Sequence, residues 1–505
     1  MGSVLPYMEQ QGSHTLHPPR VLIFPFPLQG HVNSMLKLAE LLALQGLHVT
    51  FLNTQFIYNR LLLHTDIQAR FAAYPGFLLK TISDGLPDDH PRSSDTLLDL
   101  FDSMNSISKS LLKQMLASDE LGSESSPSVT CIIADGLFGK FTTDVADELG
   151  IPIIHFRTIG ACSFWVYFSI PNIIEAGELP IRGKEDMDRL INSVPGMESF
   201  LRCRDLPNFC RLSDLTNQSL HHLVQETHHS KRAKALILNT FEDLEAPILS
   251  HIQTQFPKIY SIGPLHTHLK HKLATVASSS QSSNSFLEVD RSCIAWLNAQ
   301  PAKSVIYVSF GSLAVIVKDQ LMEFWHGLVN SNTRFLWVIR TDLVTKEGDS
   351  AQILAELLDE TKERWFIVGW APQEEVLAHP AVGGFLTHSG WNSTLESIVA
   401  GVPMICWPYF ADQQVNSRFV SEVWKIGIDM KDVCDRQIVE KVVNDLMVER
   451  REEFERVAEE MSMLARKSVN EGGSSYCNLE RLIEDIRLAR SGRFGSSKLM
   501  RDHTP

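Results

Sequence analysis

Between Trp370 and Gln413 the chain concentrates side chains that could bind an anionic ligand. Hydroxyl and amide side chains stand at the start of an expected helix, at Asn392, Ser393 and Thr394. A helix N-terminus with unpaired backbone N–H groups attracts phosphate without requiring a metal ion. His388 precedes the helix and can add another hydrogen-bond donor. These residue types therefore indicate a phosphate site.

The same stretch offers partners for the other parts of a nucleotide sugar. Trp370 presents a flat face for a nucleobase, and base–aromatic stacking contributes roughly 1–3 kcal/mol. Glu396, one turn into the helix, can accept two hydrogen bonds from a ribose diol. Asp412 and Gln413 follow the next expected strand and could hold sugar hydroxyls. A purely structural unit with Trp370 and Trp391 in the core is an alternative interpretation.

A strand–turn–helix–strand unit is needed to position these side chains. The sequence predicts a buried strand over Val382–Thr387, a turn over 388–390 and a helix over Trp391–Ala400. Gly401 and Pro403 can end that helix, and a strand is expected over Met404–Trp407. Ligands of open α/β sheets bind at the carboxyl ends of the strands, where such turns lie.

Strands and helices alternate through the rest of the chain as well. Strands are expected over Val21–Phe26, His48–Leu52, Val129–Ala134, Pro152–Phe156, Ala235–Leu238, Ile259–Ile262, Val305–Phe310 and Phe335–Arg340, and helices over Val32–Gln45, Phe141–Leu149, Gln320–Val329 and Arg450–Lys467. Such alternation implies parallel sheets with helices on both faces. We therefore predict an α/β protein of two Rossmann-like domains that face a cleft.

Joining a sugar to a hydroxyl requires a base, and His31 is the leading candidate. It follows the turn after the first strand and opens the next helix, where the helix dipole favours the neutral ring. Asp135 ends a strand of the same sheet and could hold the second ring nitrogen, as in a catalytic triad. Helix capping or core packing would explain His31 equally well, and helix capping would explain Asp135.

Other candidates flank the cleft. Ser312 follows the strand ending at Phe310 and could contact phosphate, although a simple helix N-cap is compatible with it. The loop 83–87, with Asp84, and the aromatic-rich stretch 158–168 have the composition of a pocket for a small apolar molecule. From these we predict an acceptor lining of Gly30, Asp84, Thr158 and Phe164.

Composition excludes several classes of protein. The chain has 505 residues, 44% of them hydrophobic, which fits two globular domains. A net charge of −14 disfavours nucleic acid or anionic membranes as partners. No apolar run is long enough to span a membrane, and because the first twenty residues are polar we expect no secretory signal. Eight scattered cysteines fit reduced thiols, so we expect a cytoplasmic protein.

The predicted organisation divides the chain into six segments. They are a flexible leader (1–19), an N-terminal Rossmann-like domain (20–263), a Ser-rich interdomain linker (264–290), a C-terminal Rossmann-like domain (291–470), a last helix (471–489) and a disordered tail (490–505). Residues 341–351 are expected to form a surface loop. Two groups of histidines, at 221–229 and 266–271, lack carboxylates at ligand spacing and are interpreted as solvated, so no metal site is predicted.

The stretch beginning at Trp370 resembles the signature box of plant family-1, UDP-dependent glycosyltransferases. The resemblance includes WAPQ at 370–373, HSGWNSTLES at 388–397 and ADQ at 411–413, and similarity extends from Val21 to about Arg487. It implies the two-domain GT-B fold, an acceptor-binding N-terminal half and a donor-binding C-terminal half. It also implies that the last helix, at Asn478–Leu488, returns to pack on the first domain. The donor site would then also include Ala371, Gln373 and Trp391.

The resemblance further implies a His–Asp pair at His31 and Asp135 and UDP-glucose as co-substrate, with no cofactor. The expected reaction is inverting transfer of glucose to a hydroxyl of a small apolar plant metabolite. SMLKLAELL at 34–42 and SDGLPDDHP at 83–91 are similar to enzymes that glucosylate iridoids such as 7-deoxyloganetic acid. Alternatives are a phenolic or flavonoid acceptor, an epimerase on the same fold, or a nucleotide-sugar-binding protein without catalysis.

Overall fold

The chain folds around two parallel β-sheets. The computed structural model describes residues 18–92, 96–122, 128–211, 215–275, 285, 287–340, 364–489 and 494. The first sheet contains β1 (Arg20–Phe24), β2 (His48–Thr54), β3 (Phe77–Ile82), β4 (Val129–Asp135), β5 (Ile153–Arg157), β6 (Ala235–Leu238) and β7 (Ile259–Ser261). The second contains β8 (Val305–Ser309), β9 (Arg334–Val338), β10 (Trp365–Val368), β11 (Val382–Thr387), β12 (Met404–Cys406) and β13 (Gly427–Asp429).

Both sheets have the strand order of a doubly wound fold. The first runs β3-β2-β1-β4-β5-β6-β7 and the second β10-β9-β8-β11-β12-β13, and every pairing is parallel. The order reverses between β1 and β4 in one sheet and between β8 and β11 in the other. Ligands of such sheets bind where the strand order reverses. A ligand-binding site is therefore expected at the two points where the strand order reverses.

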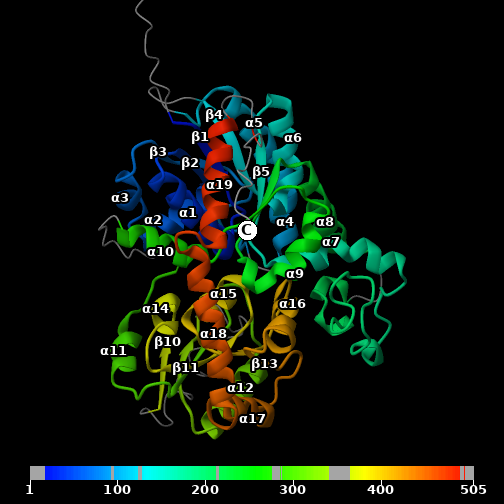
Figure 1. Ribbon diagram of the computed structural model, residues 1–505, viewed down its shortest axis with the longest axis vertical. Helices are drawn as coiled ribbons and strands as arrows, with labels where there is room; N and C mark the ends of the chain where they lie inside the picture. Colours follow the sequence, from blue (N-terminus) through cyan, green and yellow to red (C-terminus); the bar gives the residue numbers. More distant parts are fainter. Residues whose placement is uncertain are drawn as a thin grey trace, which may run out of the picture.

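Helices cover both faces of each sheet (Figure 1). In the N-terminal half they are α1 (Gln29–Leu44), α2 (Gln55–His64), α3 (Ile67–Ala72), α4 (Leu97–Ser103), α5 (Lys109–Ala117), α6 (Gly139–Leu149), α7 (Ala161–Glu175), α8 (Gln218–His229), α9 (Glu242–Gln253) and α10 (Leu265–Thr275). The C-terminal half has α11 (Ser292–Asn298), α12 (Lys318–Asn330), α14 (Gln373–Leu377), α15 (Trp391–Ala400), α16 (Gln413–Arg418), α17 (Arg436–Asn444), α18 (Arg451–Val469) and α19 (Ser474–Ala489).

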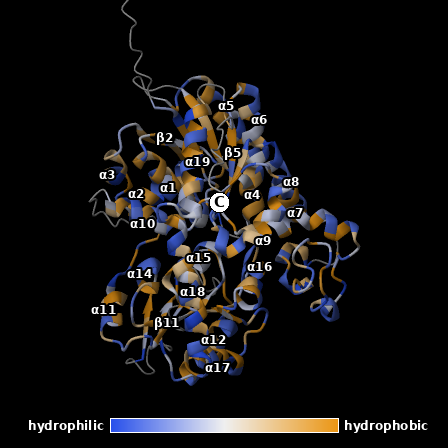
Figure 2. Cartoon of the chain, viewed as in Figure 1, coloured by the Kyte–Doolittle hydropathy of each residue, from blue (hydrophilic) through white to orange (hydrophobic). Residues whose placement is uncertain are grey.

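The sheets are buried because their strands are apolar on both faces. All five residues of β1, β5 and β8 are buried, as expected of parallel strands between helix layers. In Figure 2 the strands appear predominantly hydrophobic, whereas the helices alternate between hydrophobic and hydrophilic residues. This alternation is the pattern of helices that pack one face on a sheet.

The last helix leaves the second domain and completes the first. In Figure 1 α19 lies along the N-terminal half, above α18. Four of its apolar residues, Leu479, Leu482, Ile483 and Ile486, belong to the same buried cluster as β1, β2 and α1. Asn478 donates to the Ser261 carbonyl at 3.0 Å, and the Tyr260 hydroxyl donates to Asp485.

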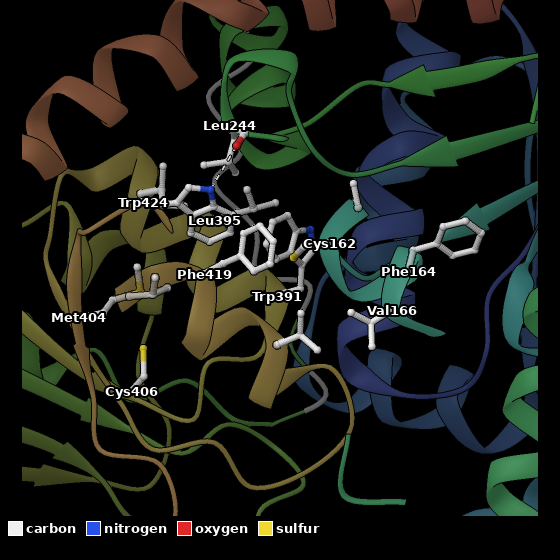
Figure 3. Close-up of a cluster of buried hydrophobic side chains, with 14 of the residues drawn as sticks. Cys162, Phe164, Val166, Leu244, Trp391, Leu395, Met404, Cys406, Phe419 and Trp424 are labelled. Carbon is white, nitrogen blue, oxygen red and sulfur yellow. Dashed lines mark hydrogen bonds between the residues drawn. The ribbon is translucent and has the colours of Figure 1, made fainter. Parts of the chain in front are cut away.

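The domains are joined by an interface with buried contacts. Figure 3 shows Cys162 and Val166 of the N-terminal half facing Trp391, Leu395 and Phe419 of the C-terminal half. Hydrogen bonds reinforce the packing: Trp424 Nε1 donates to the Leu244 carbonyl at 3.1 Å, and Ser163 donates to Asn416 Oδ1 at 2.9 Å. The interface fixes how the two sheets face one another.

Some predicted boundaries differ from the structure. Helix α1 begins at Gln29, before the predicted start at Val32, so His31 lies inside the first helical turn. The prediction of a linker from residue 264 is wrong for α10, which packs against α1 and buries Leu265, His268 and Leu269. The leader up to residue 17, most of the Ser-rich segment, the loop 341–351 and all of the tail except Phe494 lie outside the described residues.

Candidate functional site

A cleft of about 1290 Å³ lies between the two sheets. It is lined by the residues that follow β1 and β4 on one side and β8 and β11 on the other, so both reversal points open into it. The structure brings most of the predicted site residues to this cleft: Gly30, His31, Asp135, Thr158, Ser312, Trp370, Ala371, Gln373, His388, Trp391, Asn392, Ser393, Glu396, Asp412 and Gln413.

His31 and Asp135 form a close pair on the N-terminal side. His31 Nδ1 lies 2.7 Å from Asp135 Oδ2 and 2.9 Å from the Thr158 hydroxyl oxygen. With Nδ1 committed to these two partners, Nε2 is the ring atom that can exchange a proton with a substrate. The ring is mostly buried, with 16% of its side chain exposed. This is the geometry of a general base oriented by a carboxylate.

Asp135 is positioned to stay ionised although it is buried. Burial by itself would raise its pKa, but the charge and hydrogen bond of His31, the Leu137 N–H and Arg157 together lower its pKa. Leu137 donates to Oδ1 at 3.0 Å, and the Phe26 N–H donates to Oδ2 at 3.3 Å. An ionised Asp135 would stabilise an imidazolium if His31 took a proton.

On the opposite side, the start of α15 points its N-terminus into the cleft. Gly390 precedes the helix, and no side chain caps the first turn. The backbone N–H groups of that turn are therefore available to an anion. Ser393, in the first turn, and Ser312, in the turn after β8, add hydroxyl groups that line the same cleft.

His388 is packed tightly beside these donors. A Cβ atom on Gly311 would lie 2.4 Å from His388 Nε2, so only glycine fits there, and its φ of +73° also favours glycine. Burial and the nearby Arg340 lower the His388 pKa to about 4. The ring is therefore neutral at physiological pH and contributes hydrogen bonding but no charge.

Glu396 and Gln373 form a hydrogen-bonded pair in the C-terminal half. Gln373 Nε2 donates to Glu396 Oε2 and to the Ser393 hydroxyl, both at 2.8 Å. Burial, followed by repulsion from Glu374, raises the Glu396 pKa to about 7. A buried carboxylate with a raised pKa gains from further hydrogen-bond donors, such as the hydroxyls of a ribose.

Asp412 and Gln413 lie at the turn after β12. Asp412 Oδ2 accepts a hydrogen bond from Asn416 at 2.8 Å, and burial raises the Asp412 pKa to about 6. Gln413 Oε1 accepts from the Tyr409 and Phe410 N–H groups at 2.8 and 3.0 Å. These bonds orient Gln413 and leave its Nε2 as the atom that can donate to a ligand.

Two residues predicted to bind the donor make their side-chain contacts with the other domain. Trp391 is 3% exposed, and its Nε1 donates to the Asn239 carbonyl at 2.8 Å. Asn392 Nδ2 donates to the Gly30 carbonyl at 2.9 Å, while its Oδ1 accepts from Ser34 at 2.9 Å. The Asn392 side chain therefore joins the domains, and its backbone N–H is the donor that the start of α15 offers to a phosphate.

Two residues predicted to line the acceptor side do not reach the cleft. Asp84 is buried in an ion pair with Arg92, at 2.9 and 3.0 Å, that closes its own loop. Phe164 is fully buried and packs edge-to-face on Phe256. Both predictions differ from the structure because composition, in the loop of Asp84 and in helix α7 of Phe164, does not reveal which side chains turn inward.

Sequence reasoning also missed several residues of the cleft. Lys37 of α1 forms an ion pair of 2.6 Å with Glu374 of α14, across the domain boundary. Arg157 ends β5, and Tyr167 belongs to the buried helix α7; both line the cleft. The sequence signal for Arg157 is a cation at the end of a largely apolar strand, since buried arginines are rare without a partner.

The predicted solvated histidines are partly buried. His268 of α10 is fully buried, and His222 of α8 packs on Phe101 with ring centroids 4.3 Å apart. His228 Nε2 lies 3.0 Å from the Phe168 carbonyl. Within the described residues no group of three or more His, Cys, Asp or Glu could hold a metal ion, and none of the described helices could cross a membrane.

Comparisons with known proteins agree with this architecture. Residues 209–451 match the family model described as UDP-glucoronosyl and UDP-glucosyl transferase. The chain is 57% identical over 472 residues to a 7-deoxyloganetic acid glucosyl transferase of Catharanthus roseus, covering 93% of this chain and 98% of that relative.

Solved structures are similar over the same extent. Os79 of O. sativa in complex with UDP has a TM-score of 0.77 and 26% identity, covering 92% of this chain and all of that chain. UGT71G1 of Medicago truncatula complexed with UDP-glucose has a TM-score of 0.72 and 27% identity, covering 93% of this chain and 98% of that chain. The predicted fold class, two Rossmann-like domains of the GT-B type, is confirmed.

The extent of this identity, together with the two facing sheets and the cleft between them, assigns the chain to the plant family-1 UDP-dependent glycosyltransferases, which are hexosyltransferases.

Proposed function

We propose that this protein transfers glucose from UDP-glucose to a hydroxyl of an iridoid carboxylic acid, with inversion at the anomeric carbon. The proposal rests on one observation: the His31–Asp135 pair and the uncapped start of α15 lie on opposite sides of the same cleft. The similarity to a 7-deoxyloganetic acid glucosyl transferase supports the acceptor class.

In this proposal the C-terminal domain, residues 291–470, binds the donor. The uracil stacks on Trp370, and Glu396 accepts from the ribose diol, displacing the Gln373 amide that now occupies it. The diphosphate binds the first turn of α15 with Ser312 and Ser393, where N–H dipoles stabilise the charge of the departing UDP. Asp412 and Gln413 bind the glucose hydroxyls.

The N-terminal domain, residues 20–263, binds the acceptor and supplies the base. His31 Nε2 takes the proton from the acceptor hydroxyl, and that oxygen attacks the anomeric carbon from the face opposite UDP. Asp135 stabilises the resulting imidazolium through Nδ1. One displacement from the opposite face gives a β-glucoside.

Donor selectivity gives a first test. The carbonyl oxygen of Gln413 is occupied by two backbone N–H groups, so its amide nitrogen and the Asp412 carboxylate form a fixed donor–acceptor pair. Such a pair fits adjacent equatorial hydroxyls and misaligns with an axial C4 hydroxyl. We expect kcat/KM for UDP-glucose to exceed that for UDP-galactose in competition kinetics, and equal or better use of UDP-galactose would contradict the proposal.

Acceptor class is tested by measuring UDP release with iridoid, phenolic and other terpenoid alcohols at equal concentration. We expect the highest kcat/KM for an iridoid acid. If a phenolic acceptor gave a higher kcat/KM, the proposed acceptor class would be wrong, but the proposed glucosyl transfer would still stand. UDP release without any acceptor product, or tight UDP-glucose binding without turnover, would contradict glucosyl transfer itself.

A further inference from the structure

Arg157 is a buried cation whose charge helps to keep Asp135 ionised, but the proposed transfer assigns it no contact with the donor or the acceptor. It is the last residue of β5, beside Asp135 at the end of β4, and only 2% of it is exposed. That exposure opens to the cleft, which Arg157 lines. Burying a guanidinium is costly unless its donors are satisfied. An arginine at this position therefore requires an explanation.

Protein groups accept hydrogen bonds from only some of the N–H groups of the Arg157 guanidinium. Nη1 donates to the Gly136 carbonyl at 2.9 Å, and the guanidinium carbon lies 5.6 Å from the centre of the Phe164 ring. Within the described residues the bond to Gly136 is the one hydrogen bond of the Arg157 guanidinium, which forms no ion pair there and lines the cleft. A Cβ atom on Gly136 would lie 2.4 Å from Arg157 Cδ, so the neighbouring backbone is shaped to admit this side chain.

Other cations that line the cleft differ from Arg157 because they are neutralised or exposed. Lys37, Arg70 and Arg291 each form an ion pair with a glutamate, whereas Lys270 is exposed on α10. Among the described residues, Arg157 is the buried cation of the cleft that forms no ion pair with a carboxylate. Its unused N–H groups are therefore available to an anion that arrives with a substrate.

Three carboxylates near Arg157, those of Asp135, Glu226 and Asp412, accept hydrogen bonds from other groups, Asp412 from Asn416 at 2.8 Å. Asp135 accepts from His31, Phe26 and Leu137. Glu226 accepts from the Lys140 N–H at 2.8 Å, and burial raises its pKa to about 7. They lower the cost of burying the cation without occupying its donors.

Tyr167 provides a second donor in the same part of the cleft. It lies on α7, is 2% exposed and also lines the cleft. Its ring packs edge-to-face on Phe209, and within the described residues no side chain or backbone group is hydrogen-bonded to its hydroxyl. Arg157 lies close enough to lower the pKa of this hydroxyl, although burial and Asp412 outweigh that effect and raise it. Arg157 and Tyr167 thus line the same cleft and interact electrostatically.

We propose that Arg157 and Tyr167 form a carboxylate subsite in the acceptor half of the cleft, which selects acceptors that carry an ionised carboxyl group beside the hydroxyl to be glucosylated. The proposal extends the acceptor class proposed above. A guanidinium and a phenol can together hold both oxygens of a carboxylate, whereas an ester or amide offers no charge and leaves the cation unpaired. The subsite thereby penalises neutral analogues as well as favouring the acid.

The test compares one iridoid skeleton as the free acid and as its nearly isosteric primary amide, at saturating UDP-glucose. Hydrogen bonds to a charged group correspond to about 10- to 100-fold in affinity. We expect the wild-type kcat/KM for the acid to exceed that for the amide by about that factor. In Arg157→Met this ratio should fall to near unity, in Arg157→Lys it should fall less, and in Tyr167→Phe it should fall several-fold.

Arg20→Met is the matched control for loss of a buried arginine. Arg20 is fully buried in the same sheet, donates to Thr50 at 2.9 Å and does not line the cleft. Its replacement should lower the thermal midpoint and leave the acid-to-amide ratio unchanged. If Arg157→Met reduced both acceptors equally, or if wild type used the amide as well as the acid, the carboxylate subsite would be overturned.

Binding separates this inference from the proposed function. Calorimetric titration of the acid and the amide into wild-type protein saturated with UDP reports the subsite without turnover. Tighter binding of the acid supports the subsite even if no iridoid is glucosylated, an outcome that would refute only the proposed reaction. Equal binding of both ligands overturns the subsite even if glucosylation occurs, and this comparison needs no variant to fold.

Discussion

At the scale of single residues, the His31–Asp135 pair lies in a different half of the chain from the residues proposed to bind the donor. His31 belongs to the N-terminal half, whereas Glu396 and the uncapped start of α15 belong to the C-terminal half. If His31 is the base, as proposed, a change in its ring should alter proton transfer and leave the proposed contacts to UDP in place.

We expect His31→Ala to lower kcat by about 10²- to 10⁴-fold, the usual cost of losing a positioned general base. The affinity for UDP-glucose, measured by calorimetry, should stay close to wild type. Asp135→Ala should cost a similar factor or less, and the double variant should be little worse than His31→Ala, since paired residues act as a unit. Near-normal turnover in His31→Ala would remove it as the base.

Glu396 predicts a pH dependence of donor binding. With a pKa raised to about 7 in the unliganded protein, Glu396 is ionised above pH 7 and protonated below it. Only the ionised form can accept from both ribose hydroxyls, so UDP affinity should weaken as pH falls from about 8 to about 6. The dissociation constant of UDP, measured by calorimetry across this range, reports the change.

Glu396→Gln is the control for that titration. It removes the titrating group, so its UDP affinity should be lower than wild type at pH 8, and the pH-dependent loss should be reduced. An equal pH dependence in wild type and Glu396→Gln would assign the titration to another group, such as the UDP phosphate.

At the scale of elements, local patterns predicted the strands and helices that carry the site. Strand β11 and helix α15 were predicted at their observed residues because alternation, Gly401 and Pro403 mark their ends. Helix α10 was missed because its composition is polar, although its apolar face packs on α1. Side-chain direction in α7 was not predictable from its aromatic content, since the helix buries nearly every side.

The start of α15 also bears on metal dependence. The N–H groups of its first turn, with Ser312 and Ser393, should stabilise the developing charge on the departing phosphate. We expect turnover to be unchanged when divalent cations are removed with EDTA and unchanged again when magnesium is restored. A loss of activity with EDTA that magnesium reverses would show that the helix start is insufficient.

At the scale of the whole molecule, the domains share buried hydrogen bonds that neither domain's sequence pattern reveals. Trp391 and Asn392 stand in the donor stretch, and their local context indicated a ligand. Their side chains contact Asn239, Gly30 and Ser34 instead, because the other domain lies directly against α15. These contacts could not be predicted from the sequence, because they depend on how the two domains pack against each other.

Replacing Trp391 with Phe tests the strength of that junction. The change keeps an aromatic ring but leaves the buried Asn239 carbonyl without its donor, which costs about 1–3 kcal/mol. We expect a lower midpoint in scanning calorimetry and faster limited proteolysis between the domains. Trp296→Phe, a partly buried tryptophan packed on Phe366 within the C-terminal half, is the comparison. A midpoint unchanged in Trp391→Phe would show that the bond adds nothing to the junction.

Helix α19 has a consequence for how the protein is made. Synthesis proceeds from the N-terminus, and domains generally fold as they emerge from the ribosome. The first sheet, however, keeps part of its apolar surface uncovered until Leu479, Leu482, Ile483 and Ile486 arrive at the far end of the chain. The N-terminal half of the nascent chain therefore keeps a hydrophobic face exposed to solvent while more than two hundred further residues (roughly 262–489) are translated. Early release or truncation before residue 474 would leave that face open, and a chaperone that binds apolar surface would have its longest opportunity at this stage of synthesis.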